Sequence, residues 1–338
     1  MTSKRIMFIP GDVGGCGYYR NLQIAHFAIL TNNQIIRPMY SGVQTLQNAN
    51  QDITFTQRVA SEKGFQTIKK FKNDCGCKLV IDYDDLVWSK DKLHNYNMFI
   101  NQMNIMDNYK SMEKHLSEVA DLVTVTNDEL KKSVAQFIDE SKIILVPNML
   151  SMNDWLFDRT TMLPNDDIFF YAGSLSHYNN KRKQHGDFSI PFANYLSKHN
   201  SIFMGDEAPW FMNTVYEYSW VDLAKYAKAL YQNSRYAKFT IAPLSNNIFN
   251  QCKSPLKLLE SAAIGRVCLV SDFDGSPYHD LSHPLQRIPE NASIKDIENI
   301  VKIAKENYAE ILDFQYKMLN NYWLDLNFWK YENIFASL

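Results

Sequence analysis

Cysteine is scarce in this chain, and its pattern excludes a zinc-stapled or disulfide-stapled fold. A structural zinc site needs four ligands at recognisable spacings, and the Cys75-Gly76-Cys77 pair has no second pair to complete it. Disulfide frameworks need an even set of paired cysteines in a secreted chain. We therefore expect free thiols in a reducing compartment at the five cysteines: Cys16, Cys75, Cys77, Cys252 and Cys268.

The chain also lacks long apolar runs and a surplus of charge of either sign. Its longest apolar runs, such as 77–81 and 267–270, have the length of a strand, whereas a bilayer span needs about 20 residues. The formal net charge is −2, with 17 Lys and Arg against 16 Asp and Glu in residues 1–150 and 18 against 21 in the remainder. We expect no membrane insertion, and bulk charge gives no reason to expect nucleic-acid binding, although a local patch stays open. The N-terminus shows no signal-peptide pattern, which predicts a cytoplasmic protein.

Apolar strands and helical segments alternate along the 338 residues, and the alternation starts twice. Strands alternating with helices predict parallel sheets covered on both faces, and this length suits two domains of roughly 150 residues each. The expected strands are 5–9, 34–40, 53–56, 78–81, 122–125 and 143–146, then 168–172, 202–204, 239–242 and 267–270. The expected helices are 18–30, 60–72, 97–119 and 128–137, then 188–198, 220–231, 255–264 and a long tail over 294–335.

An irregular stretch at 149–166 separates the two series. The predicted fold is therefore α/β, with two Rossmann-like doubly wound domains facing across a cleft. We set the domains at 1–148 and 149–310, with a C-terminal helix at 311–338. Ligands of such sheets bind at the carboxyl ends of the strands.

A glycine-rich turn follows the first strand and opens the first helix. It reads Gly11-Asp12-Val13-Gly14-Gly15-Cys16-Gly17-Tyr18-Tyr19-Arg20. Glycines allow a close backbone approach to a ligand, and the helix N-terminus behind them favours anions or sugar hydroxyls. The spacing is not the GxGxxG of dinucleotide binders, and no clear acidic residue ends the second strand, which argues against NAD. A tight turn without a ligand is the alternative. Gly15, Gly17 and Arg20 are candidate catalytic-site residues.

Acidic residues end the strand at 78–81, in the order Asp82-Tyr83-Asp84-Asp85. Two carboxylates two residues apart can hold Mg²⁺ or Mn²⁺. Aspartates at a strand end also commonly cap the next turn. Because a metal-binding DxD belongs to single-domain enzymes, the two-domain pattern disfavours a metal. Asp84 and Asp85 are candidate catalytic-site residues, and we expect them to line the cleft on the acceptor side.

The first turn of the second domain reads Tyr171-Ala172-Gly173-Ser174-Leu175-Ser176-His177, and Lys181-Arg182-Lys183 follows. Small residues beside a basic cluster suit a diphosphate. A solvated basic loop is the alternative. The candidate donor-binding residues here are Gly173, Ser174, His177 and Lys181.

The strongest motif is Lys253-Ser254-Pro255-Leu256-Lys257, which opens a helix that ends at Gly265. Ser254 and Pro255 are typical of the N-cap and first position of a helix, so this N-terminus should face a phosphate flanked by Lys253 and Lys257. Glu260 lies on the same helix face as Lys257 and could accept hydrogen bonds from both ribose hydroxyls. The alternative is a surface pair between Lys257 and Glu260.

At this helix the sequence resembles the GT-B glycosyltransferases of the retaining, sucrose-synthase and mannosyltransferase-like group. Their donor domain reads roughly E-x7-E-x4-G-x-P-V-V, in which Glu260 matches the second Glu and Gly265 the Gly, while Cys252 stands at the first Glu. The resemblance implies that Glu260 binds the donor ribose and that Lys181 is the nearest match to the family's phosphate lysine. Val146-Pro147-Asn148 resembles the entry to the second domain in these enzymes, and the C-terminal helix resembles one that crosses back to the first domain.

More narrowly, the glycine-rich turn, the aspartates, Gly173-Ser174-x-x-His177 and the Lys253 motif resemble glycosyltransferases of large tailed bacteriophages. The resemblance implies transfer of a sugar from a nucleoside diphosphate sugar, expected to be UDP-linked, to a hydroxyl acceptor. The resemblance to the retaining GT-B group implies retention of the anomeric configuration, no metal and no cofactor other than the donor. Many such phage enzymes modify hydroxymethylated pyrimidines in duplex DNA, which makes that DNA a candidate acceptor and a bacterial host cytoplasm the expected location.

Two other functions remain open on the sequence alone. A GT-B nucleotide-sugar epimerase would act on the donor without an acceptor. A non-catalytic protein could keep the fold and the nucleotide-sugar site but lose activity, and Cys252 in place of a carboxylate favours that interpretation.

Overall fold

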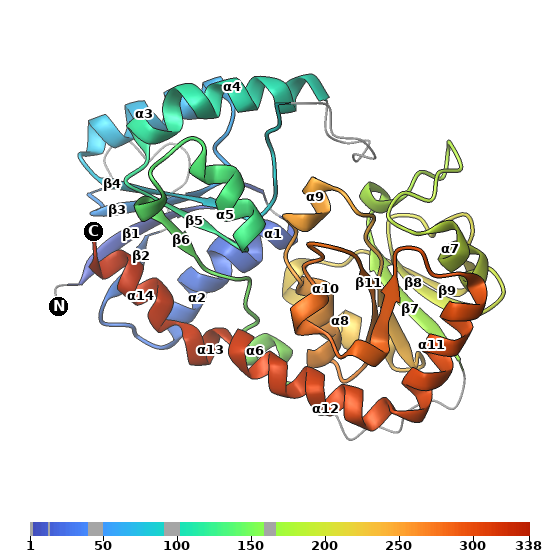
Figure 1. Cartoon of the computed structure of the whole chain (residues 1–338). Helices are drawn as coiled ribbons and strands as arrows, with labels where there is room; N and C mark the ends of the chain where they lie inside the picture. The colour runs from blue at the N-terminus through green and yellow to red at the C-terminus, as the bar shows by residue number, and fades with distance from the viewer. Residues whose placement is uncertain (1–2, 13, 40–49, 91–101, 159–166) are drawn as a thin grey trace.

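The computed structural model of the chain describes residues 3–12, 14–39, 50–90, 102–158 and 167–338. It contains two six-stranded sheets, and every strand pair within them is parallel (Figure 1). The first sheet comprises β1 (Lys4–Ile9), β2 (Ile36–Met39), β3 (Ile53–Gln57), β4 (Lys78–Tyr83), β5 (Leu122–Val125) and β6 (Ile143–Leu145). The second comprises β7 (Phe169–Gly173), β8 (Asn200–Gly205), β9 (Asn213–Ser219), β10 (Phe239–Ala242), β11 (Val267–Asp272) and β12 (Arg287–Pro289).

Both sheets are doubly wound, as the alternation predicted. The strand order is β2-β1-β3-β4-β5-β6 in the first sheet and β12-β11-β10-β7-β8-β9 in the second. In each sheet the chain moves outward from its first strand, then returns past it and continues to the other edge. The switch points therefore lie between β1 and β3 and between β7 and β10, where ligands of doubly wound sheets bind.

Helices cover both faces of each sheet. Those of the first series are α1 (Gly15–Gly17), the π-helical turn η1 (Tyr18–Leu22), α2 (Gln23–Leu30), α3 (Glu62–Cys75), α4 (Gln102–Val119) and α5 (Asp128–Ala135). Those that follow are α6 (Met152–Trp155), α7 (Ile190–Leu196), α8 (Leu223–Ser234), α9 (Ile248–Gln251), α10 (Leu256–Ala263) and α11 (Ile294–Glu306). The apolar side chains form one core on each face of each sheet.

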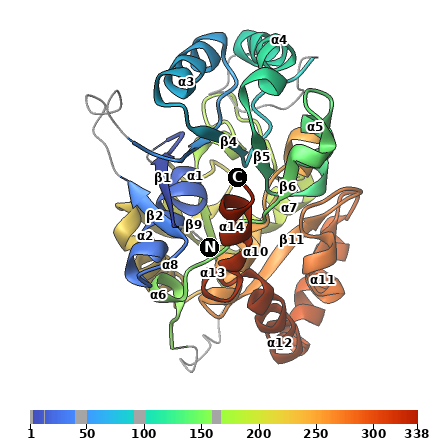
Figure 2. The same ribbon diagram turned by 90° about the vertical axis from the view of Figure 1, so that its left-hand side faces the viewer.

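The C-terminal segment returns to the first sheet. It consists of α12 (Tyr308–Leu319), α13 (Leu324–Asn327) and α14 (Trp329–Ala336), so the long tail is several helices rather than one. Phe328 and Phe335 pack in the same core as Phe8 and Phe55 of the first sheet. Figures 1 and 2 show α12 beside the second sheet and α14 beside the first, with both termini on the side of the first sheet. The chain thus joins its two sheets at two places, near α6 and along these helices.

The structure corrects several expected elements. The segment 213–219 is the edge strand β9, and 287–289 is the edge strand β12; neither was predicted. The helix expected from 220 begins at Leu223, and the irregular stretch contains the short helix α6. The first helix begins at Gly15, inside the glycine-rich turn. The expected start of the helix at 97 and the second half of the irregular stretch, 159–166, lie outside the described residues.

Among the described residues, no helix combines the length and the apolar character that a membrane span requires.

Candidate active site

The residues at the carboxyl ends of the two sheets enclose a cavity of about 750 Å³. The first domain contributes the start of α1 and the end of β4, and the second contributes the turn after β7 and the start of α10. Ten predicted site residues line it: Gly15, Asp84, Asp85, Gly173, Ser174, His177, Lys253, Ser254, Lys257 and Glu260. The cavity therefore brings together residues from four segments that are far apart in the sequence.

Helix α10 presents its N-terminus to this cavity. Leu256 and Lys257, its first two residues, both line the cavity. The first N–H groups of any helix have no acceptor within the helix, so this end can bind an anion. The predicted cap is wrong in detail: Pro255, not Ser254, is the N-cap residue, and the Ser254 hydroxyl instead accepts a hydrogen bond from Asn148 Nδ2 at 2.8 Å. The predicted stop is confirmed, because the helix ends just before Gly265, whose φ is +74°.

Two lysines flank the start of α10. Lys257 Nζ donates to the carbonyl oxygen of Ala172 at the end of β7 and lies 5.1 Å from the centre of the Tyr171 ring. Burial lowers the pKa of Lys257. Lys253 Nζ lies 3.9 Å from a carboxylate oxygen of Asp85, which belongs to the other domain. The lysines thus place positive charge on both sides of the helix N-terminus.

Glu260 is a buried carboxylate rather than a surface group. It is 7% exposed and accepts hydrogen bonds from Tyr19 Oη at 2.9 Å and from Tyr226 Oη at 3.3 Å. Burial raises the pKa of Glu260, whereas the charge of Lys257 and the two tyrosine hydroxyls lower it. The surface pair with Lys257 therefore does not describe this residue. Tyr19 comes from the first domain, so Glu260 also joins the two domains at the cavity wall.

His177 follows β7 in a single helical turn and is paired with an aspartate. Its Nδ1 lies 2.7 Å from Asp187 Oδ2, and the two side chains are 12% and 10% exposed. Burial lowers the pKa of His177, and the hydrogen bond to Asp187 opposes that effect. Asp187 was not predicted as a site residue. Its pairing with His177 makes the imidazole a fixed part of the cavity wall.

The acidic cluster at the end of β4 is held by Arg58, which sequence analysis also missed. Arg58 binds both oxygens of Asp84, at 2.7 and 2.9 Å, and one oxygen of Asp85 at 2.7 Å. It also binds Asp12 at 3.1 Å. Burial tends to raise the pKa of Asp84, but the charge of Arg58 holds that pKa below its usual range. Gln57 ends the neighbouring strand β3 and Arg58 follows it, so a polar strand end at the same sheet edge was the available signal.

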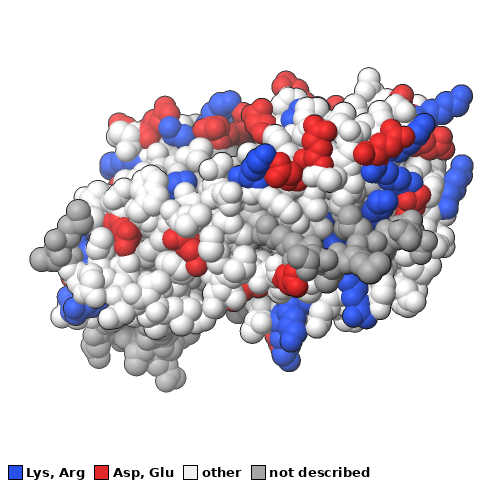
Figure 3. Space-filling view, turned by 90° about the horizontal axis from the view of Figure 1, so that it is seen from below, with Lys and Arg blue, Asp and Glu red and all other residues white. Residues whose placement is uncertain are grey.

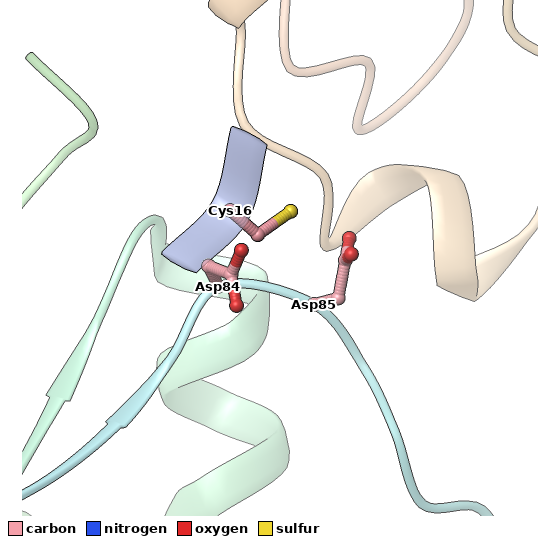
Figure 4. Close-up of side chains that lie close together, drawn as sticks. All are labelled: Cys16, Asp84 and Asp85. Atoms are coloured by element: carbon pink, nitrogen blue, oxygen red, sulfur yellow. The ribbon is translucent and has the colours of Figure 1, made fainter. Parts of the chain in front are cut away.

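Cys16, Asp84 and Asp85 lie close together, with their ligand atoms within 4.8 Å of one another (Figure 4). A metal ion that used all three ligands would bind Cys16 as its thiolate. Burial and the charge of Asp84 raise the pKa of the Cys16 thiol, which favours the protonated form. The carboxylates already share the guanidinium of Arg58.

Three predicted site residues lie outside the cavity lining. Arg20 is 0% exposed and bound to Asp82, with Arg20 Nε 3.0 Å from Asp82 Oδ2, so it supports the turn rather than a ligand. Asp82 therefore pairs with Arg20, whereas Asp84 pairs with Arg58, and the two aspartates do not form a DxD pair. Gly17 is needed for packing, because a Cβ there would lie 2.0 Å from the carbonyl oxygen of Asp12. Lys181 is exposed in the loop beyond His177.

The residues at the start of α8 form a part of the cavity wall that is apolar apart from Asp222. Trp220, Val221, Leu223 and Tyr226 line it, and the rings of Trp220 and Tyr226 are 6.1 Å apart between centres. Trp220 is 39% exposed, which leaves its ring accessible to a ligand. An aromatic face beside a carboxylate and an anion site provides the three surfaces that a nucleotide needs: base, ribose and phosphate.

Comparison with solved structures identifies the arrangement of the two domains. The chain has the GT-B fold. It superposes on HepE of Anabaena in complex with UDP-glucose over 99% of this chain and 100% of that one, with a TM-score of 0.65 and 10% identity. It also matches the lipopolysaccharide outer core galactosyltransferase WaaB over 100% of both chains, with a TM-score of 0.58 and 15% identity.

A third similar structure is a mutant of T4 phage BGT in complex with UDP-glucose. The match covers 96% of this chain and 97% of the phage protein, with a TM-score of 0.53 and 14% identity. No protein-family model and no curated protein matches the sequence. At these identities the likeness establishes the fold, and function has to be argued from the cavity.

Proposed function

We propose that this chain is a glycosyltransferase that uses a nucleoside diphosphate sugar, UDP-linked, and transfers the sugar to a hydroxyl acceptor. The observation that carries the proposal is the grouping of Lys253, Lys257 and Glu260 around the N-terminus of α10, opposite Asp84 and Asp85 across one cavity. The structures of HepE and T4 phage BGT that share this fold hold UDP-glucose, which supports a donor of that class.

The second domain binds the donor in this proposal. The diphosphate lies at the start of α10 between Lys253 and Lys257, beside Gly173 and Ser174. The ribose hydroxyls donate to Glu260, and the base packs on Trp220. The helix N-terminus and lysines then stabilise the negative charge that the diphosphate gains as the sugar leaves, without a metal ion.

The first domain binds the acceptor. Asp84 is fully engaged by Arg58 and Gln57, so it holds Arg58 rather than exchanging protons. Asp85 is 23% exposed and has one oxygen toward Arg58, so its other oxygen can accept a hydrogen bond from the acceptor hydroxyl. We propose retention, in which the leaving phosphate takes the acceptor proton on the same face. If Asp85 instead acted as a general base on the opposite face, the product anomer would be inverted, which proton NMR of the first product distinguishes.

Duplex DNA with hydroxymethylated pyrimidines is the acceptor we propose to test first, in the cytoplasm of a bacterial host. The resemblance of the glycine-rich turn and the Lys253 motif to phage glycosyltransferases motivates that choice. On the face drawn in Figure 3, Lys and Arg lie among Asp and Glu rather than forming a continuous basic surface, so this face gives no electrostatic argument for DNA binding. If DNA is not modified, the acceptor is a hydroxyl of a glycan, a lipid or a protein.

A non-catalytic nucleotide-sugar-binding protein is the second candidate, and Cys252 favours it. Its thiol lies 3.9 Å from Ser133 Oγ, and its side chain is 0% exposed in a core shared with the first domain. No carboxylate therefore stands where the family's first glutamate does.

The deciding experiment incubates the protein with a panel of labelled UDP-sugars, with and without hydroxymethylated duplex DNA, and identifies products by mass spectrometry. Glu260→Gln serves as the impaired variant and Glu310→Gln, with a 65% exposed side chain, as its matched control. Glycosylated product from wild type and Glu310→Gln supports transfer. Epimerised donor without acceptor identifies an epimerase. Donor binding without any product in the whole acceptor panel identifies a binding protein.

A further inference from the structure

The pairing of His177 with Asp187 determines which imidazole nitrogen of His177 carries the proton. Asp187 Oδ2 lies 2.7 Å from His177 Nδ1. Burial tends to raise the pKa of Asp187, but the hydrogen bond with His177 holds it below its usual range, so the carboxylate is ionised. An ionised carboxylate can only accept, so Nδ1 carries the proton. In the neutral ring Nε2 therefore carries no proton. His177 itself lines the cavity.

The other oxygen of Asp187 fixes the carboxylate in place. Oδ1 accepts from Ser245 N at 3.3 Å, from Ser245 Oγ at 2.9 Å and from Asn250 Nδ2 at 2.7 Å. Each oxygen thus has its own partners, and the one that faces His177 cannot rotate away without breaking three hydrogen bonds.

Burial and two lysines lower the pKa of His177 while the cavity holds no anion. Lys253, just before α10, and Lys257, within it, both lower the pKa of His177, and burial lowers it most. Asp187 acts in the opposite direction. Tyr278 lines the same cavity, but burial raises its pKa, so it stays uncharged. A bound diphosphate adds negative charge beside the two lysines and therefore favours the imidazolium.

We propose that His177 takes up a proton when a nucleoside diphosphate sugar binds, and that the imidazolium then donates from Nε2 to a phosphate oxygen. Asp187 is the positioning residue that holds Nδ1. This inference rests on the proposed function, because it needs the donor diphosphate in the cavity. It adds a third positive group beside Lys253 and Lys257 only when a phosphate is there to bind it.

The sign of the pH dependence follows from linkage. Proton uptake on binding means that donor affinity falls as pH rises above the pKa of His177 in the empty protein. The fall is at most about tenfold per pH unit for one proton, and it levels off above the pKa in the complex.

The test is calorimetric titration with UDP-glucose, whose phosphates do not titrate near neutral pH. Each titration is run at one pH in two buffers that differ in enthalpy of ionisation. The difference in observed heat gives the number of protons taken up. We expect a value that approaches about one proton per site at a pH between the two pKa values of His177, and none at high pH.

Three variants assign the proton to this residue. His177→Gln cannot be protonated, so uptake should vanish while binding weakens. In Asp187→Asn the retained oxygen can still accept from Ser245 and Asn250, while the new amide N–H donates to His177 Nδ1. Nε2 then carries a proton in the neutral ring and can bind phosphate directly, so binding should persist with uptake lost. The matched control is His279→Gln, because His279 also pairs with an aspartate, Asp272, at 2.6 Å but does not line the cavity.

The outcomes separate the inference from the function on which it rests. If folded wild-type protein binds no UDP-glucose or other nucleotide sugar, the proposed function fails. If it binds without proton uptake, or if uptake persists in His177→Gln, the function stands and the inference is wrong. Uptake that persists in Asp187→Asn overturns the positioning role of Asp187. Thermal unfolding of each variant confirms that it is folded.

Discussion

The two domains contribute opposite kinds of residue to the cavity. The second domain supplies a helix N-terminus, two lysines and a buried glutamate from one stretch, Lys253 to Glu260. The first domain supplies carboxylates that are bound to arginines from other strands and turns, as in Arg58 with Asp84. The second-domain side can receive an anion, whereas on the first-domain side the carboxylates outnumber Arg58 and offer hydrogen-bond acceptors. This difference is the basis of our proposal that the second domain binds the donor and the first domain binds the acceptor.

The largest expected effect concerns stability on the first-domain side. Arg20→Met should cost about 3–5 kcal/mol of unfolding free energy, because it leaves Asp82 buried and unpaired. Both side chains of this pair are 0% exposed. Arg5→Met is the control, since its pair with Asp52 is 41% and 36% exposed and should be worth less than about 1 kcal/mol. Urea denaturation measures both, and equal losses would contradict the structural role of Arg20.

On the second-domain side, Lys257→Met should weaken UDP binding and spare uridine. A hydrogen bond to a charged group is worth about 1.5–3 kcal/mol, so UDP affinity should fall roughly tenfold to a hundredfold. Lys317→Met, at a lysine whose side chain is 75% exposed, should change neither affinity. Calorimetry with both ligands decides this, and equal losses for UDP and uridine would move Lys257 away from the phosphates.

Trp220→Ala should weaken UDP and uridine alike. Stacking of a base on an aromatic ring contributes about 1–3 kcal/mol, and the base is common to both ligands. Trp329→Ala is the control, because that ring is 53% exposed on α14 and outside the cavity lining. Unchanged uridine affinity in Trp220→Ala would place the base elsewhere in the cavity.

The smallest expected effect is that of metal removal on sugar transfer. Activity should survive EDTA, because Arg58 occupies the carboxylates of Asp84 and Asp85 and burial favours a protonated Cys16. The assay compares rates before and after chelation and after Mn²⁺ is added back. Complete loss with recovery on Mn²⁺ would show that the acidic cluster binds a catalytic metal after all.

The same comparison explains which features could be predicted from the sequence. The residues around α10 lie within one helical turn or two of each other, so spacing alone placed them at one site. The partners of the buried carboxylates could not be found that way, because Arg58 and Asp84 are 26 residues apart and Tyr19 and Glu260 are 241 apart. These long-range contacts depend on the order of the strands in the sheets, which cannot be read directly from the sequence.

Among the strands, the two that were missed lie at the edges of the second sheet. β9 is exposed or half-exposed along its whole length, so it lacks the apolar face that marks a strand in the sequence. β12 has only three residues. The buried strands β7, β10 and β11 were predicted because both of their faces are covered.

The central claim is that the second domain binds a nucleoside diphosphate sugar through Glu260 and the start of α10. Calorimetric titration of UDP into wild type and Glu260→Gln tests it most directly, with Glu310→Gln as control. The account predicts binding by wild type and the control, and an affinity roughly tenfold to a hundredfold lower in Glu260→Gln, because the amide cannot accept from both ribose hydroxyls. Equal affinity in all three proteins, or no binding to the folded wild type, would contradict it.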